Sequence, residues 1–214
     1  MIDIKAMFDM SYGVYIVSSL DDLRPVGCIV NTVFQITANP MTVAISVNKD
    51  NYTEDCIRKN GHFAVSTISE KTPQSIIGTF GFQSSRDTNK FEGLKSRTVQ
   101  NDLHVITEET CSYITCKVLK EVDTLTHTIF IGEVIEAEKL TENPPMTYAY
   151  YHKVKGGKTA KNAPTYVAED IKDGYVCNIC GYKFDGTKED LENLPEDWKC
   201  PICGQDKSHL KAQE

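Results

Sequence analysis

Four cysteines near the C-terminus form two C-x-x-C pairs, Cys177 with Cys180 and Cys200 with Cys203. This spacing is typical of a metal site, because paired cysteines on two tight turns can direct four thiolates at one ion. Four thiolates at about 2.3 Å form a tetrahedral cage that suits iron or zinc. Iron would make the site an electron carrier, whereas zinc would make it a structural support, and the spacing alone leaves both open.

The residues around the two pairs favour iron. A glycine, Gly181 or Gly204, follows the second cysteine of each pair and can adopt the positive φ that closes a tight turn. A module of this size needs a small apolar core if it is to fold around one metal. Four aromatic residues can supply that core: Tyr175, Tyr182, Phe184 and Trp198.

Residues 173–214 resemble the rubredoxin family, through the strings YVCNICGYKFD (175–185) and LPEDWKCPICG (194–204). The resemblance implies one iron ion per chain, held by the four cysteines of the two pairs. It departs from the family at one point, because the segment between the pairs is shorter than in the usual rubredoxin. The surface near the metal is therefore expected to differ. A zinc ribbon is the alternative, although it has no need of this aromatic packing.

The composition of the chain is that of an ordinary globular protein, with 214 residues, 40% hydrophobic and 25% charged. Enough chain precedes the cysteine-rich module for one domain with a sizeable core. The net charge of -7 argues against nucleic acid as a partner. We find no run near the ~20 apolar residues of a membrane span and no signal-peptide pattern. These features predict a cytoplasmic protein without a membrane partner.

The remaining cysteines show no metal-ligand spacing and are interpreted as free, buried thiols. Free thiols agree with a reducing cytoplasm. They are Cys28, Cys56, Cys111 and Cys116.

The chain divides into a domain over 1–155, a linker over 156–172 that is poor in apolar residues, and the module over 173–214. The first domain is predicted to be mainly β with short helices, most plausibly a closed or nearly closed barrel. The predicted strands are 13–19, 26–37, 41–47, 63–68, 114–119 and 129–137, the last two as a hairpin. The predicted helices are 53–59, with Thr53 as N-cap, and 71–80.

The N-terminal domain has no G-x-G-x-x-G string, which argues against a Rossmann dinucleotide-binding domain. It also has no Walker A loop. Five strings in order resemble instead the flavin reductase-like family of FMN-binding split β-barrels. They are VNTVFQITANP (30–40), VAISVNKDNYT (43–53), GHFAVS (61–66), SSRDTNKF (84–91) and HTIFIGEV (127–134).

The resemblance implies one non-covalently bound FMN, and three residues are expected at its ring. Asn31 and Thr32 can form hydrogen bonds with the polar edge of the isoalloxazine. His127 would lie beside the flavin and could place a reductant or move a proton. The alternative for His127 is a strand histidine with its hydrogen bonds satisfied.

Four further residues are expected at the ribityl chain and the phosphate of FMN. Lys49, Lys90 and Thr53 can bind and neutralise the phosphate, and Asn48 can serve the ribityl–phosphate region. Taken singly, each lysine is more often a solvated surface residue, and Thr53 is more often a plain N-cap.

The two halves together resemble the high-molecular-weight rubredoxin family, in which an FMN reductase-like domain is fused to a rubredoxin. The resemblance implies a homodimeric NADH- or NADPH-dependent oxidoreductase that passes electrons to a flavodiiron protein, which reduces nitric oxide or dioxygen. A flavin suits this task because nicotinamides deliver two electrons as hydride and a four-thiolate iron accepts one. Two alternatives stay open: an electron-transfer intermediate without a nicotinamide site, or a flavin or ferric reductase with a structural zinc ribbon.

Overall fold

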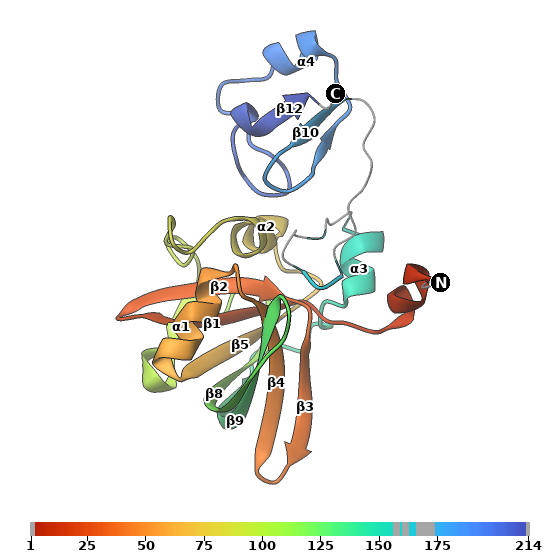
Figure 1. Ribbon diagram of the computed structural model, residues 1–214. Coiled ribbons are helices and arrows are strands. Elements are labelled where there is room, and N and C mark those ends of the chain that lie inside the picture. The colour runs from red at the N-terminus through yellow and green to blue at the C-terminus, as the bar shows by residue number, and fades with distance from the viewer. Residues whose placement is uncertain (1–2, 156–158, 160–162, 166–173, 213–214) are drawn as a thin grey trace.

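The computed structural model describes residues 3–155, 159, 163–165 and 174–212. Figure 1 shows a strongly curved antiparallel sheet below and a small module, built from the C-terminal residues, above helix α2 (Gln74–Phe82). The large sheet has seven strands in the order β2-β1-β5-β8-β9-β4-β3. These strands are β1 (Tyr15–Asp21), β2 (Arg24–Val30), β3 (Val33–Ala38), β4 (Met41–Asn48), β5 (His62–Ile68), β8 (Thr110–Asp123) and β9 (His127–Lys139).

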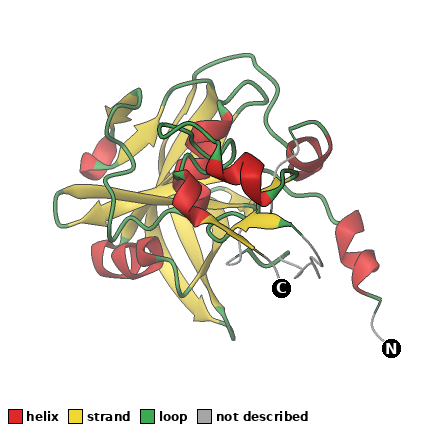
Figure 2. Cartoon of the chain, turned by 90° about the horizontal axis from the view of Figure 1, so that it is seen from above, coloured by secondary structure: helices red, strands yellow, loops and turns green. Residues whose placement is uncertain are grey.

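Short elements connect and cover the strands, and Figure 2 shows the helices lying around the sheet when it is seen from above. Strands β6 and β7 form a small separate ladder. The remaining elements of the larger unit are η1 (Ile4–Asp9), α1 (Tyr52–Asn60), β6 (Ser96–Thr98), η2 (Gln100–Asp102), β7 (His104–Ile106) and α3 (Tyr148–Lys153).

The core lies inside the curved sheet and continues beneath α2. Val17, Ile45, Phe63 and Phe130 are fully buried members of the first cluster. Gly132 lies in β9 against the ring of Phe63, and a Cβ there would come within 2.7 Å of that ring. Glycine at this position therefore lets the Phe63 ring pack directly against the backbone of β9. A second cluster packs α2 against β1, β5 and β7 through Ile16, Ile68, Ile76, Ile77, Phe80 and Ile106.

The C-terminal module is a three-stranded sheet in the order β11-β10-β12. The predicted aromatic residues are partly buried and pack on the four cysteines, and the rings of Tyr182 and Trp198 lie 6.4 Å apart. Thr187 and Asp190 form a capping box at the start of its helix. The elements are β10 (Tyr175–Cys177), β11 (Lys183–Phe184), α4 (Lys188–Glu192), η3 (Lys207–His209) and β12 (Leu210–Ala212).

The predicted mainly β character and the hairpin of β8 and β9 are confirmed, and two local predictions are wrong. The single strand expected over 26–37 is broken at residues 31–32, because β2 pairs with β1 whereas β3 pairs with β4. Helix α1 has Asn51 rather than Thr53 as its N-cap, with an extended backbone at Asn51 and its carbonyl accepting from Glu54 N at 2.8 Å. Among the described residues, no helix is long and apolar enough to cross a membrane.

Candidate cofactor and metal sites

Each C-x-x-C pair lies on a tight turn closed by the glycine that follows it. Gly181 N donates to Cys177 O at 2.8 Å with a φ of 75°, and Gly204 N donates to Cys200 O at 2.8 Å with a φ of 72°. A residue with a Cβ is strained at such φ values, so glycine is the residue that fits. The two turns face each other because β10 and the chain after Cys200 belong to one small core.

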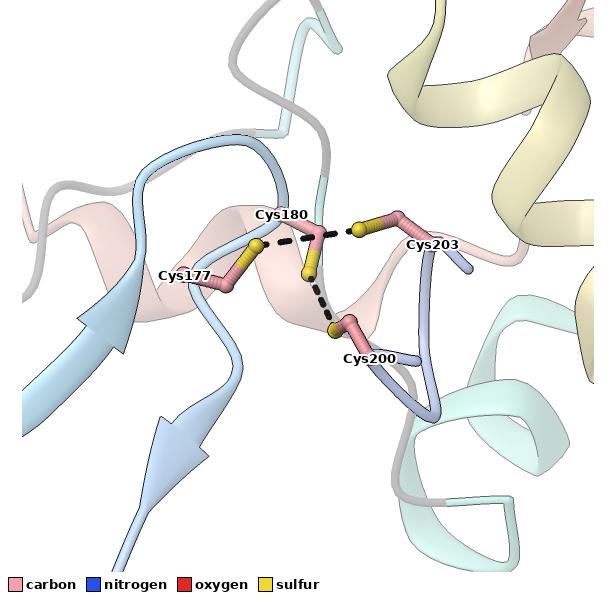
Figure 3. A group of neighbouring side chains, drawn as sticks. All are labelled: Cys177, Cys180, Cys200 and Cys203. Carbon is pink, nitrogen blue, oxygen red and sulfur yellow. Dashed lines mark hydrogen bonds between the residues drawn. The ribbon is translucent and has the colours of Figure 1, made fainter. Parts of the chain in front are cut away.

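The four sulfur atoms lie within 4.8 Å of one another (Figure 3). The Sγ atoms of Cys177 and Cys203 are 3.7 Å apart, and those of Cys180 and Cys200 are 3.5 Å apart. Four ligands at about 2.3 Å from a central ion, in a tetrahedron, lie ~3.8 Å from one another. The donor set therefore fits one tetrahedral thiophilic ion, and all four cysteines are buried and free.

Crowding of the four thiols makes their ionisation interdependent. The hydrogen bond with Cys180 contributes most to holding the pKa of Cys177 far below its usual range, and the same contact raises the pKa of Cys180. The pKa of Cys200 is lowered as well and that of Cys203 is raised, so two thiols are favoured as thiolates while the other two retain their protons. A bound cation removes this conflict, because it favours the ionised form of all four ligands.

A cavity with mostly apolar walls and a polar edge opens between the large sheet, α2 and α3. Its apolar lining includes Ile29, Val30, Ile77, Phe80, Tyr148 and Tyr151. Its polar lining includes Asn31, Ser46, Asn48, Asn51, His127 and Thr159. A flat aromatic group with hydrogen-bonding atoms along one edge fits such a site. We call it the ring cavity.

A second, more polar cavity adjoins the ring cavity and shares Cys28, Asn51, Gly81 and Phe82 with it. It lies at the N-terminus of α1, and its walls include Tyr52, Thr53, Ser84, Ser85 and Lys90. Backbone N–H groups at a helix start and a buried ammonium are typical of an anion site. We call it the anion cavity.

Lys90 is the cationic group of the anion cavity. Its side chain is buried, and Nζ donates to Gly27 O at 2.8 Å and to Phe80 O at 3.2 Å. Burial lowers the pKa of Lys90 to about 8. An anion bound beside it would restore the charged form. Together, the two cavities fit the ring and the phosphate of one FMN molecule.

His127 and Asn31, both predicted to lie at the flavin ring, are in the wall of the ring cavity. His127 begins β9, pairs with Asn48 across the ladder and has Nδ1 at 2.9 Å from Thr126 Oγ1. Asn31 is 5% exposed and donates from Nδ2 to Thr165 Oγ1 at 3.1 Å. The hydroxyl groups of Tyr148 and Thr159, which lie 2.7 Å apart, line this part of the cavity.

Two predicted residues lie outside the walls of both cavities. Thr32 donates to Asn31 Oδ1 at 3.1 Å and contacts the ring cavity only through that amide. Lys49 donates to Thr124 O at 2.9 Å and forms an ion pair with Asp123 at 3.2 Å. The structure brings together Asn31, Asn48, Thr53, Lys90 and His127.

Sequence reasoning missed Asn51, Phe82 and Tyr148, which also line these cavities. Asn51 carried a usable signal, because asparagine directly before a helical run is a preferred N-cap. Phe82 and Tyr148 carried none, because an aromatic residue in a short helix is usually a core residue.

Known families and relatives match this chain in sequence. The family model described as "Flavin reductase like domain" matches residues 7–157. The chain is 40% identical over 222 residues to the high molecular weight rubredoxin of Moorella thermoacetica, covering 96% of this chain and 97% of that protein. It is 41% identical to a ferric-chelate reductase (NAD(P)H) of Archaeoglobus fulgidus, covering 77% of this chain and 97% of that protein.

Solved structures share the fold. An NADH:FAD oxidoreductase of Streptomyces globisporus superposes with a TM-score of 0.62 at 21% identity, covering 69% of this chain and 90% of that one. A flavoredoxin of Methanosarcina acetivorans gives a TM-score of 0.56 at 21% identity, covering 63% and 74%. These likenesses confirm the predicted barrel fold of the N-terminal unit.

Proposed function

The chain belongs to the flavin reductase-like family, and from this premise we propose that it carries electrons from NADH through FMN and a C-terminal iron to a flavodiiron-type protein. It is an NADH-dependent flavin oxidoreductase with one FMN and one four-cysteine iron per chain. The terminal reaction at the partner would be reduction of nitric oxide or dioxygen. NADPH is the alternative donor.

One observation carries the proposal: Phe82 belongs both to the wall of the ring cavity and to the aromatic packing around the four cysteines. A flavin site and a thiolate metal site therefore meet at one side chain. A reductase that used the metal only as a structural support would have no need of this contact. The second candidate function is reduction of a soluble ferric chelate, because 77% of this chain is similar to a ferric-chelate reductase.

A bound flavin accepts hydride from a nicotinamide and releases electrons singly, chemistry that amino-acid side chains do not supply. Asn31 and Asn48 would orient the polar edge of the ring, and Lys90 and Thr53 would hold the phosphate. The apolar wall formed by Val30, Ile77 and Phe80 excludes water from the ring. His127, in the same cavity, would place the nicotinamide or hold a proton at an imidazole nitrogen.

Cys177, Cys180, Cys200 and Cys203 would hold the iron. We keep the division of the chain into a flavin domain over 1–155, a linker over 156–172 and a rubredoxin-like domain over 173–214 as part of the proposal. A cytoplasmic location is also proposed, and it is supported by eight cysteines that are all free in the part of the chain that the structure describes.

A homodimer completes the proposal, supported by the exposed apolar surface of the β3–β4 hairpin. Phe34 is 55% exposed, and Ile36 and Met41 are each 45% exposed. Strand β3 is an edge of the large sheet and has no buried residue. A second copy of the chain would cover these side chains and the strand edge.

The proposal is tested by removing one metal ligand. In Cys180→Ala the iron site has three thiolates, so iron is expected to be lost. NADH oxidation with an artificial acceptor should persist, because the polar residues expected to hold FMN (Asn31, Asn48, Thr53 and Lys90) all belong to the barrel. Electron delivery from NADH to a purified flavodiiron protein should collapse by about a hundredfold or more. NADH consumption is measured with each acceptor in turn.

Cys111→Ala is the matched control, because Cys111 is a buried thiol that lines neither cavity and is not one of the four clustered cysteines. Its Sγ donates to Asn143 O at 3.3 Å. It should support both reactions. Full delivery to the flavodiiron protein by Cys180→Ala would remove the iron from the path.

A further inference from the structure

The C-terminal module rests on helix α2 through its second cysteine turn, residues 200–204. Gly78 is in the middle of α2, and a Cβ built there would fall against the carbonyl oxygen of Ile202 and within 2.9 Å of Cys203 Cα. Figure 1 shows the module directly above α2. The backbones of the two units therefore approach more closely here than a residue with a side chain at position 78 would permit.

Glycine in the interior of a helix is less favourable than alanine, so its presence there needs a reason. Ile76 and Ile77 before Gly78, and Phe80 after it, are buried in the apolar cluster that packs α2 on the barrel. Gly78 is buried, but it does not line the ring cavity or the anion cavity. Its position is explained by the close approach of Ile202 and Cys203.

Three further contacts join the C-terminal module to the barrel. Gln83 donates from Nε2 to the carbonyl oxygen of Cys203 at 3.3 Å. Phe82 packs against the cluster formed by the four cysteines. Ile179, from the first cysteine turn, closes one wall of the anion cavity. Both cysteine turns thus face the flavin half of the chain, and the strands of the module lie behind them.

We propose that the surface of α2 formed by Gly78, Phe82 and Gln83 is a built-in docking site for residues 202–203, and that electrons leave the flavin through it. Gly78 is the positioning residue, because it sets how near Cys203 comes to the wall of the ring cavity. This inference rests on the proposed function. Each crossing oxidises the flavin by one electron and reduces iron(III) to iron(II), and no covalent bond forms or breaks.

The docking site is tested with Gly78→Leu in the full-length protein loaded with FMN and iron. The added side chain lies where the Ile202 carbonyl is, so the module should be pushed off α2. Small-angle X-ray scattering should then give a larger radius of gyration. In single-turnover reduction, the flavin band should bleach at the wild-type rate while the iron band bleaches at least about tenfold more slowly, since a misplacement of ~1 Å between reacting groups can cost about a hundredfold.

Ser75→Leu is the matched control, because Ser75 is an exposed residue on the same helix. It should keep the wild-type radius of gyration and both rates. Gly78→Ala is the second variant if Gly78→Leu does not fold, since its Cβ alone meets the module. A wild-type radius of gyration, or a wild-type rate of iron reduction, in the Gly78 variant overturns the docking site.

The scattering result does not depend on the electron donor, so it decides the docking site even if NADH fails to reduce the flavin. In that case photoreduction of the flavin supplies the electrons for the kinetic arm. Failure of NADH in the wild-type protein would contradict the proposed function and leave the scattering test of docking intact.

Discussion

At the scale of single residues, Lys90 and Lys49 differ in what surrounds their ammonium groups. The structure buries Lys90 in the anion cavity, whereas Lys49 pairs with Asp123. The difference depends on the chain between β8 and β9, which brings Asp123 and Thr124 to Lys49. These residues are distant from Lys49 in the sequence, so the residues flanking Lys49 do not reveal the contact.

The buried ammonium of Lys90 predicts how FMN affinity depends on pH. The phosphate of FMN becomes a dianion above its second pKa of about 6. The pKa of Lys90 is lowered to about 8 by burial, so its positive charge is present below pH 8 and is lost above it. Affinity should therefore be greatest between these values and should fall by up to about tenfold per pH unit above pH 8, because binding must then take up a proton.

The measurement is titration of the apoprotein with FMN by flavin fluorescence at a series of pH values. Lys90→Met should bind FMN more weakly at pH 7 and lose the decline above pH 8. Lys49→Met is the comparison variant and should keep that decline. Riboflavin, which has no phosphate, should show no such pH dependence, and an equal decline with riboflavin would contradict the assignment of Lys90.

At the scale of elements, most strands and the β8–β9 hairpin were predictable, whereas the pairing of the other strands was not. The stretch over 26–37 is rich in strand-forming residues, yet the chain changes partner at Asn31 and Thr32. That break places Asn31 in the wall of the ring cavity instead of in a ladder. A period of two residues identifies a strand, but the partner of each strand is set by contacts distant in sequence. The β6–β7 ladder was missed because its strands are too short to show alternation.

The β3–β4 hairpin carries the prediction about assembly. If a second copy of the chain covers this surface, Phe34→Glu combined with Ile36→Glu should produce a monomer, because charge would be buried against an apolar face. Analytical ultracentrifugation gives the mass directly, against 24.0 kDa for one chain. Leu23→Glu is the control, since Leu23 is 84% exposed in the β1–β2 turn and should leave the dimer intact.

A wild-type protein that sediments as a monomer with full flavin occupancy would contradict the dimer. A double variant that remains dimeric would place the interface elsewhere on the surface.

At the scale of the whole molecule, the two halves differ in how far sequence determines them. The cysteine spacing and the glycines after each pair predicted the four-sulfur cluster directly, because local turns build each half of it. The cavities of the barrel draw on residues from β2, β4, α1, α2, β9 and α3, so only the family resemblance indicated them. The contact between the halves could not be predicted, since Gly78 has no local signal that distinguishes it from any helical glycine.

Electrons are expected to pass from NADH to the flavin and then to the iron within one chain. Anaerobic stopped-flow mixing of the FMN- and iron-loaded protein with NADH tests this order, with the flavin and iron absorption bands followed separately. The flavin band should bleach first, at a rate that rises with NADH concentration. The iron band should follow at a rate independent of both NADH and protein concentration. Iron that stays oxidised while the flavin is fully reduced would show that the flavin does not reduce the iron of its own chain.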